Sequence, residues 1–186
     1  MPIDPNELRR GRICLAVFPF APAFPLTLED GTALQSVEDW ARSFKGSPGR
    51  VVSEARLRPI VPLHDRTRTG HGDVVCLRIN TVKAAHRADP TTWKKIEQQE
   101  HPFFFHLPAA TGRYQLREDS VIAITSIAAV HRSAILAATG GELARHELEQ
   151  IGEKLVRALD VDLAPWVAAK ARELLAKAGI ELPPQS

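Results

Sequence analysis

The chain has 186 residues, of which 44% are hydrophobic and 25% charged, so it can bury the core of one domain and carry a small appendage. Its net charge of +2 makes it mildly basic, which by itself is a weak indication of a nucleic-acid partner. Two cysteines are too few for the disulfide framework of a small secreted protein, and no apolar run reaches the ~18 residues of a membrane span. Residues 1–8 lack the apolar core of a signal peptide, so we expect a cytoplasmic protein without a membrane partner.

The first predicted elements are a strand and a short helix. A basic lead-in, Arg9–Arg12, runs into the apolar segment Ile13–Phe18, which predicts the first strand. Residues 19–27 hold three prolines and are predicted to form a loop. Ser36 is a suitable N-cap and predicts a helix from Val37 to Phe44.

The middle of the chain alternates between irregular and strongly apolar segments. Val51–Leu57 predicts a strand interrupted by charges. Arg58–Leu63 follows, and its two prolines place it at a sheet edge or a bend, because proline cannot donate to a ladder. Residues 64–72 form a polar turn, and Asp73–Thr81 is the strongest predicted strand.

A helix and further strands follow. Asp89 as N-cap and Pro90 in the first turn predict a helix to about Glu100. Pro102–Leu107 and Ser120–Ile124 predict strands, and Ile127–Val130 extends the second of these or follows a kink.

The hydrophobic period then changes to that of helices. Apolar residues at steps of three and four predict an amphipathic helix between Gly141 and Leu159, with Gly140-Gly141 as the break before it. A second helix is predicted for residues 165–178, with Gly179 as its C-terminal cap. Short strands first and helices last predict an α+β, mainly β protein: a small bent β-barrel with an inserted helical loop and two C-terminal helices.

Arginines and two strand-end residues are the candidate functional side chains. The planar guanidinium offers two parallel donors to a phosphate, so the arginines indicate either an anion site or a solvated cationic surface. They are Arg10 and Arg12 before the first strand, and Arg50, Arg56, Arg58, Arg66 and Arg68 in the next basic stretch. Asn80 and Thr81, which end the strongest strand, can hydrogen-bond a phosphate or a base, or satisfy their own turn.

Other chemistry has little support in the sequence. The histidines lack the spacing of a zinc site, and there is no phosphate-binding glycine loop, nucleophile elbow or Cys–His signature. We therefore expect no metal and no cofactor. His64 or His71 could act as a general acid or base, although no motif supports this. Cys14 and Cys76 lie in apolar runs and are predicted to be buried, reduced thiols.

Taken in order, five segments resemble the MazF/PemK toxin family of bacterial toxin–antitoxin systems. Each match is weak by itself, and the resemblance lies in their order across residues 9–159. The segments are the lead-in and strand Arg10–Ala16, the Arg-Pro strand Arg58–Val61, the apolar strand Val74–Thr81, the Ser-Val-Ile strand Asp119–Ile124 trailing into Arg132, and the helix Gly141–Leu159.

The resemblance implies a fold, an activity and partners. The fold would be an SH3-like β-barrel over residues 9–159 with an insert at about 20–57, forming a homodimer and followed by a helical extension at 160–186. The activity would be metal-independent, sequence-selective endoribonuclease cleavage of single-stranded RNA, in which the 2′-hydroxyl attacks the adjacent phosphate and leaves a 2′,3′-cyclic phosphate and a 5′-hydroxyl. A cognate antitoxin protein would be the partner.

The resemblance also implies site residues. The family's main catalytic positions fall on Arg58 and Thr81. We expect RNA contacts from the neighbouring basic and amide side chains, which are Arg10, Arg12, Arg56, Arg66, Arg68 and Asn80.

The chain also departs from the family's pattern. Its first loop is much longer than usual, and the second C-terminal helix is additional. Charged positions on the fourth-strand segment are taken by Ala123 and Thr125, and an arginine after that strand is replaced by Ala128 or Ala129. A second interpretation therefore stays open: a non-catalytic SH3-like barrel of the same origin that binds nucleic acid or protein.

Overall fold

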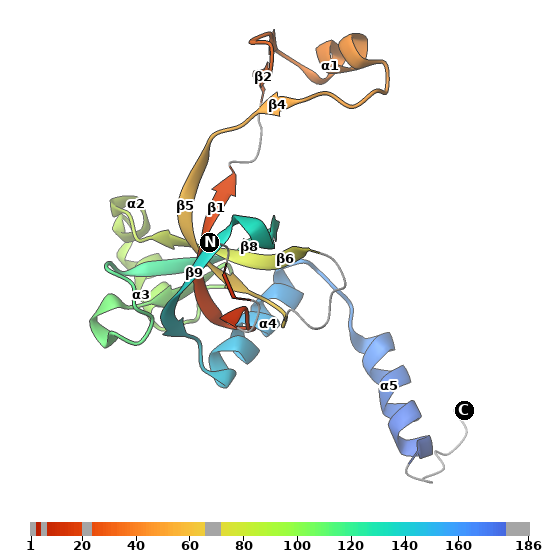
Figure 1. Ribbon diagram of the computed structural model, residues 1–186. Coiled ribbons are helices and arrows are strands. Elements are labelled where there is room, and N and C mark those ends of the chain that lie inside the picture. The colour runs from red at the N-terminus through yellow and green to blue at the C-terminus, as the bar shows by residue number, and fades with distance from the viewer. Residues whose placement is uncertain (1–2, 5–6, 20–23, 66–71, 178–186) are drawn as a thin grey trace.

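The computed structural model describes residues 3–4, 7–19, 24–65 and 72–177. An antiparallel sheet of six strands, in the order β7-β8-β6-β5-β1-β9, curls into a half-barrel (Figure 1). The mainly β fold class is confirmed. The strands of this sheet are β1 (Arg12–Pro19), β5 (Ala55–Pro62), β6 (Asp73–Thr81), β7 (Phe104–Leu107), β8 (Ser120–His131) and β9 (Ile135–Glu142).

Helices α2 to α5 of the described residues accompany the sheet. The short α2 (Ala84–Arg87) and α3 (Pro90–Glu97) connect β6 to β7, and α4 (Arg145–Ala158) and α5 (Ala164–Lys177) follow β9. The predicted start of α3 is confirmed, because Asp89 accepts a hydrogen bond from the backbone N–H of Thr91, but the helix ends three residues earlier than predicted. Helix α2 was not predicted.

Strands β1 and β6 lie where the apolar patterns predict them, and β6 has the predicted ends. The prediction that the two prolines of β5 lie at a sheet edge is wrong, because β5 is between β1 and β6 in the sheet. The sheet accommodates Pro59 because residues 55–59 pair with β1 alone, and pairing with β6 begins at Ile60, opposite Arg78. Pro59 therefore lies just outside the ladder to which it could not donate.

Both faces of the sheet carry a hydrophobic core, because side chains alternate along each strand. One face, here called the α4 face, packs against α4 through Ile151; its strand residues include Ile13, Val61, Leu77, Ile79 and Ile122. The opposite face, here called the N-terminal face, is partly covered by Ile3 and Leu8; its strand residues include Cys14, Ala16, Ile60, Cys76 and Val130. The backbone N–H of Ile3 holds this cover in place by donating to Ile135 O at 3.1 Å.

The two cysteines are free and buried in the N-terminal face, as predicted. Burial raises the pKa of Cys14 to about 11 and that of Cys76 to about 12. Both thiols are therefore held in the unreactive protonated form at neutral pH.

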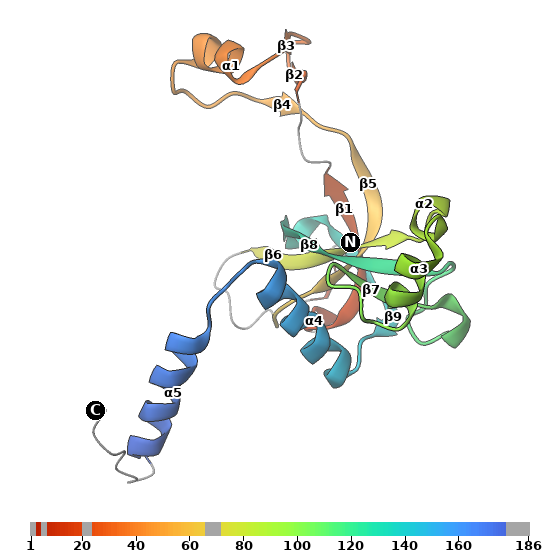
Figure 2. The same cartoon turned by 180° about the vertical axis from the view of Figure 1, so that it is seen from behind.

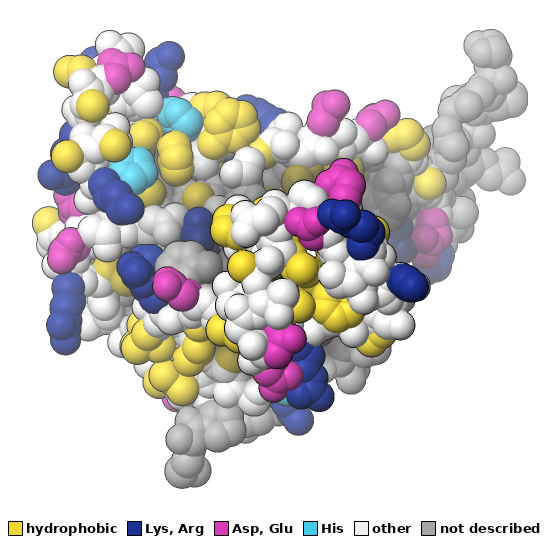
Figure 3. All heavy atoms as spheres, turned by 90° about the horizontal axis from the view of Figure 1, so that it is seen from above, with side chains coloured by type: hydrophobic (Ala, Val, Ile, Leu, Met, Phe, Trp, Pro, Cys, Tyr) yellow, Lys and Arg dark blue, Asp and Glu magenta, His cyan; other side chains and the backbone are white. Residues whose placement is uncertain are grey.

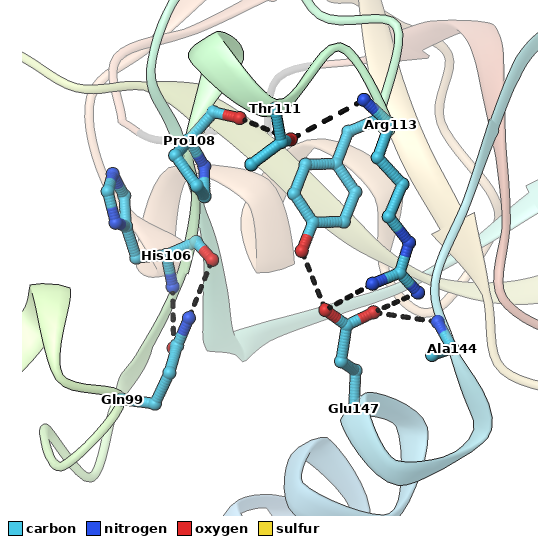
Figure 4. Close-up of polar contacts among 8 residues, drawn as sticks. Gln99, His106, Pro108, Thr111, Arg113, Ala144 and Glu147 are labelled. Carbon is cyan, nitrogen blue, oxygen red and sulfur yellow. Dashed lines mark hydrogen bonds and ion pairs between the residues drawn. The ribbon is translucent and has the colours of Figure 1, made fainter.

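A buried carboxylate ties α4 to the segment before β8 (Figure 4). Glu147 accepts hydrogen bonds from the Tyr114 hydroxyl at 2.6 Å and from the Ala144 backbone N–H at 2.7 Å. It also forms an ion pair with Arg113 at 2.9 Å, and it is only 7% exposed. Burial, together with the bond to Glu147, raises the pKa of Tyr114 to about 12. We call these residues the Glu147 clamp.

The same segment explains a wrong helix boundary. Gly140 and Gly141 belong to β9 and α4 begins at Arg145, whereas the sequence pattern suggested that the glycines open the helix. A Cβ atom on Gly141 would lie 2.0 Å from the carbonyl oxygen of Tyr114. Gly141 is therefore required for the close passage of β9 over the backbone at Tyr114.

The long insert forms a small module at the end of the two-stranded ribbon made by β1 and β5 (Figures 1 and 2). Its sheet has the order β3-β2-β4, from β2 (Leu26–Leu28), β3 (Ala33–Leu34) and β4 (Val51–Val52). Two predictions are corrected here: the loop over residues 19–27 gives way to β2 at Leu26, and the strand predicted over Val51–Leu57 is divided between β4 and β5.

The helix of the module, α1 (Val37–Phe44), has the predicted bounds because Ser36 Oγ accepts from the Asp39 N–H at 3.2 Å. Trp40 and Phe44 stack on its surface with ring centroids 4.5 Å apart. Seen from above, where the module lies nearest the viewer, acidic and basic side chains adjoin one another with hydrophobic side chains between them (Figure 3).

Helix α5 extends away from the sheet (Figures 1 and 2). Its Val167 and Leu174 are exposed. The predicted cap at Gly179 lies outside the described residues. None of the helices in the described part of the chain is both long and apolar enough to span a bilayer.

The Glu147 clamp generates a stability prediction. Glu147→Ala should lower the free energy of unfolding by about 2 kcal/mol, because it leaves the buried Tyr114 hydroxyl and Ala144 N–H without their acceptor. Urea denaturation measures the loss. The matched control is Glu149→Ala on the same helix, whose exposed pair with Arg145 should contribute at most about 0.5 kcal/mol. Equal losses in the two variants would show that the clamp does not hold α4.

Candidate functional site

One register brings two arginines to the same face of the sheet. Ile60 of β5 lies opposite Cys14 of β1 and opposite Arg78 of β6. Arg58 is two residues from Ile60 on β5, so Arg58 and Arg78 both project from the N-terminal face as diagonal neighbours across the two strands. Continuing the same alternation, Asn80 also belongs to this face.

The part of the N-terminal face around Arg58 is less covered than the part beneath Ile3 and Leu8. Arg58 is half-buried, and Arg56, two residues further from the core, is exposed. Phe18 packs at the margin of the buried cluster and lies opposite Arg56. We call Phe18, Arg58, Arg78 and Asn80 the arginine site.

The side chain of Arg58 has no hydrogen bond or ion pair with any residue that the structure describes. This distinguishes it from two other arginines of the basic stretches. Arg12 pairs with Glu7 at 3.8 Å, and Arg50 pairs with Glu29 at 3.2 Å. No described residue therefore occupies the donors of the half-buried Arg58 guanidinium, and they can bind a ligand.

Arg78 was not predicted as a site residue. Its guanidinium carbon lies 5.8 Å from the centre of the Phe18 ring, and its buried Nε has no hydrogen-bond partner. The signal was present in the sequence, because Arg78 interrupts the apolar run of β6 between Leu77 and Ile79. An arginine inside a strand that is buried on both sides needs either a partner or a function.

The structure separates the two residues predicted to be catalytic. Thr81 is the exposed last residue of β6 and pairs with Ser120. Since it follows Asn80, alternation directs its side chain to the α4 face, whereas Arg58 projects from the N-terminal face. Asn80 is the strand-end residue that shares a face with Arg58.

The remaining predicted RNA contacts are distributed more widely. The backbone N–H of Arg10 donates to Asp65 Oδ1 at 2.8 Å, and its side chain is exposed. Arg12 lies four residues before Ala16, the partner of Arg58, on the same face of β1. Arg66 and Arg68 lie outside the described residues.

Of the two histidines considered for acid–base chemistry, His64 lies within the described residues. His64 Nε2 accepts a hydrogen bond from the backbone N–H of Val75 at 3.0 Å, which is a structural role. His71 lies outside the described residues. Within the described ranges, no three His, Cys, Asp or Glu side chains gather in a group that could hold a metal ion.

Comparison of the sequence with protein-family models and with curated proteins gives no match. Among solved structures, the fold is similar to an endoribonuclease in complex with its cognate antitoxin from a mycobacterial species, with a TM-score of 0.44 and 13% identity over 83% of this chain and 96% of that chain. It is similar to the toxin MazF-mt6 of Mycobacterium tuberculosis, with a TM-score of 0.43 and 17% identity over 57% and 90% of the two chains. A mycobacterial endoribonuclease gives a TM-score of 0.39 and 15% identity over 56% and 82%.

The Arg58 side chain has no described partner, so its removal should affect stability less than the removal of an arginine that stabilises the fold. Arg58→Met keeps the aliphatic stem and removes a charge that has no described partner, so the free energy of unfolding should stay within about 0.5 kcal/mol of the wild type or rise. Arg113→Met, which breaks the Glu147 clamp, should lower it by about 1 kcal/mol or more. Parallel urea titrations compare the two variants, and an equal loss would assign Arg58 to the fold.

Proposed function

We propose that the protein is a metal-independent, sequence-selective endoribonuclease of the MazF/PemK type, acting on single-stranded RNA as the toxin of a toxin–antitoxin pair. The observation that carries the proposal is Arg58, at the position that the sequence resemblance assigns to catalysis. Its half-buried guanidinium has no hydrogen-bond or ion-pair partner among the described residues, and strand alternation puts Arg78 and Asn80 on the same face of the sheet. A charge held ready in this way suits a phosphate whose negative charge grows during the reaction.

In the proposed reaction, the 2′-oxygen bonds to the adjacent phosphorus while the bond from phosphorus to the 5′-oxygen breaks. The 2′-hydroxyl loses its proton and the departing 5′-oxygen gains one, which gives the 2′,3′-cyclic phosphate and the 5′-hydroxyl. Arg58 donates hydrogen bonds to the non-bridging oxygens as the phosphorane forms. Removing one such preorganised donor typically costs about 10²- to 10³-fold in rate.

The second donor is proposed at the end of β6. The sequence resemblance assigns this role to Thr81, and the strand alternation favours Asn80, because Asn80 shares the face of Arg58. The amide nitrogen of Asn80 can donate to a phosphate oxygen or to a base edge, whereas Thr81 offers a hydroxyl from the other face.

Protein partners complete the proposal: an antitoxin and a second copy of the chain, in the cytoplasm. What supports a protein partner is an exposed apolar pair on the ribbon. Val17 and Leu57 are cross-strand neighbours and are 41% and 52% exposed. Paired apolar side chains left open on a sheet are typical of surfaces that bind another protein.

A non-catalytic RNA-binding barrel is the second candidate. Ala123 is buried and Thr125 is exposed on β8, so the charges expected on this segment from the resemblance are missing. This candidate predicts salt-dependent RNA binding without cleavage products.

The first functional prediction concerns Arg58. The purified wild-type protein should cut single-stranded RNA in the presence of EDTA, with cyclic phosphate and 5′-hydroxyl ends, and Arg58→Ala should cut at least about 100-fold more slowly. Gel analysis of end-labelled RNA measures both. Induced expression should arrest growth for the wild type and not for the variant. RNA left intact by the wild type would favour the binding barrel, and equal cutting by the variant would exclude this role of Arg58.

The second functional prediction compares neighbours at the strand end. Asn80→Ala should lower the cleavage rate about tenfold or more, because a donor on the face of Arg58 is lost. Thr81→Ala should lower it less if alternation decides which residue contacts the phosphate. Single-turnover rates at saturating RNA measure the two. A larger loss of cleavage rate in Thr81→Ala than in Asn80→Ala would assign the second phosphate donor to Thr81, as the family resemblance implies.

A further inference from the structure

We propose that Arg78 is a second phosphate-binding residue, which holds the RNA phosphate next to the one bound by Arg58. The identity of the ligand rests on the proposed function, whereas the existence of the site rests on the geometry of β5, β6 and β1. The arginine site would then bind two phosphates of one strand rather than a single phosphate.

The register supplies the first argument. Arg78 is opposite Ile60, and Arg58 is two residues along β5 from Ile60, so Arg58 and Arg78 are on the same face of the sheet. The ladder between β5 and β6 ends at Ile60 on this side. Both guanidinium groups therefore project from the same face, at the place where the two strands begin to separate.

The state of the Arg78 side chain supplies the second argument. A buried donor without an acceptor destabilises the fold, yet the Arg78 Nε is buried and has no hydrogen-bond partner among the described residues. The Phe18 ring, 5.8 Å from the guanidinium carbon, gives the cation a favourable surface but accepts no hydrogen bond along the N–H direction. An anion would satisfy this donor and offset the repulsion between the two neighbouring arginines.

The irregular pairing of β8 supplies a third, independent argument. Leu77 of β6 pairs with Ile127 of β8, but Ile79 pairs with Ile122, so residues 123–126 bulge opposite Arg78. A bulge of this kind re-aims side chains and is common beside functional sites. The ladder is thus interrupted on both sides of β6 near Arg78, which frees this position from the regular packing of the sheet.

A purely structural arginine would be expected to look different. The chain contains such a residue in Arg113, which is paired with the buried Glu147 and fixes α4. The side chain of Arg78 has no ion pair and no hydrogen bond with a described residue. A solvated surface arginine would be different again, because its Nε would be in water.

The experiment measures binding apart from cleavage. The probe is a short, fluorescein-labelled 2′-O-methyl RNA of mixed sequence, which lacks the 2′-hydroxyl needed for cutting. Fluorescence anisotropy gives its affinity for the full-length wild type, Arg78→Gln and Arg78→Lys at a series of salt concentrations. The matched control is Arg157→Gln, which removes one charge from the exposed side of α4, on the opposite side of the sheet.

Arg78→Gln should weaken binding about tenfold and lower the slope of log affinity against log salt by about 0.7, the value for one phosphate contact on a single strand. Arg78→Lys should keep the slope and lose part of the affinity, since it keeps the charge without the planar fork. Arg157→Gln should change neither quantity. Inorganic phosphate should compete with the probe only at much higher concentration than unlabelled RNA.

The outcomes separate the two proposals. Unchanged affinity and slope in Arg78→Gln would overturn the second phosphate contact, whether or not the wild type cuts RNA. Lost affinity and slope, in a wild type that leaves unmodified RNA intact, would support the contact and overturn the nuclease. If Arg78→Gln unfolds at a lower urea concentration than the wild type, the RNA affinity of Arg78→Lys is compared with that of the wild type instead. Equal affinity of these two proteins would overturn the role of the guanidinium fork.

Discussion

The position of Ile60 in the antiparallel register of β1, β5 and β6 determines both the core and the arginine site. Ile60 is fully buried and lies between Cys14 and Arg78 on the neighbouring strands. A slip of one residue would turn Ile60 towards the α4 face and would move Arg58 and Arg78 relative to one another. The apolar side chains that stabilise the sheet therefore also fix the spacing of the charged side chains.

The N-terminal face has two parts. In one, apolar side chains are covered by the N-terminal segment; in the other, the side chains of Arg58 and Arg78 have no hydrogen-bond partner among the described residues. Ile3 and Leu8 pack against the buried thiols and the aliphatic strand residues, whereas Arg58 is half-buried and Arg56 is exposed. On the other side of the sheet lies the Glu147 clamp, whose charged groups stabilise the fold. Each of its members has a hydrogen-bond or ion-pair partner. The contrast between the fully paired Glu147 clamp and the unpaired guanidinium groups of Arg58 and Arg78 supports the proposal that the arginine site binds a ligand.

Local signals in the sequence predicted the elements that depend on local physics. The apolar run of β6 and the serine cap of α1 gave the observed bounds, because neither needs a distant partner. The internal place of β5 and the strand at Gly141 could not be predicted in this way, because they depend on where β6 pairing begins and on the backbone of Tyr114. For the candidate site, the family resemblance named Arg58 and Thr81, and their catalytic roles stay predictions, whereas the shared face of Arg58, Arg78 and Asn80 requires the register.

The β1–β5 ribbon allows the segment between its two strands to be shortened or lengthened without a change in the half-barrel. The chain leaves the half-barrel at Pro19 and returns at Ala55, and these two residues are cross-strand partners. Topologically, residues 20–54 are thus one enlarged hairpin turn, and the register below it is the same whatever that turn contains. Closing a loop of this length rather than a tight turn costs only about 2 kcal/mol, since each doubling adds about 0.6 kcal/mol. The module can therefore be lost, shortened or exchanged between related chains while the half-barrel and its arginines stay in place.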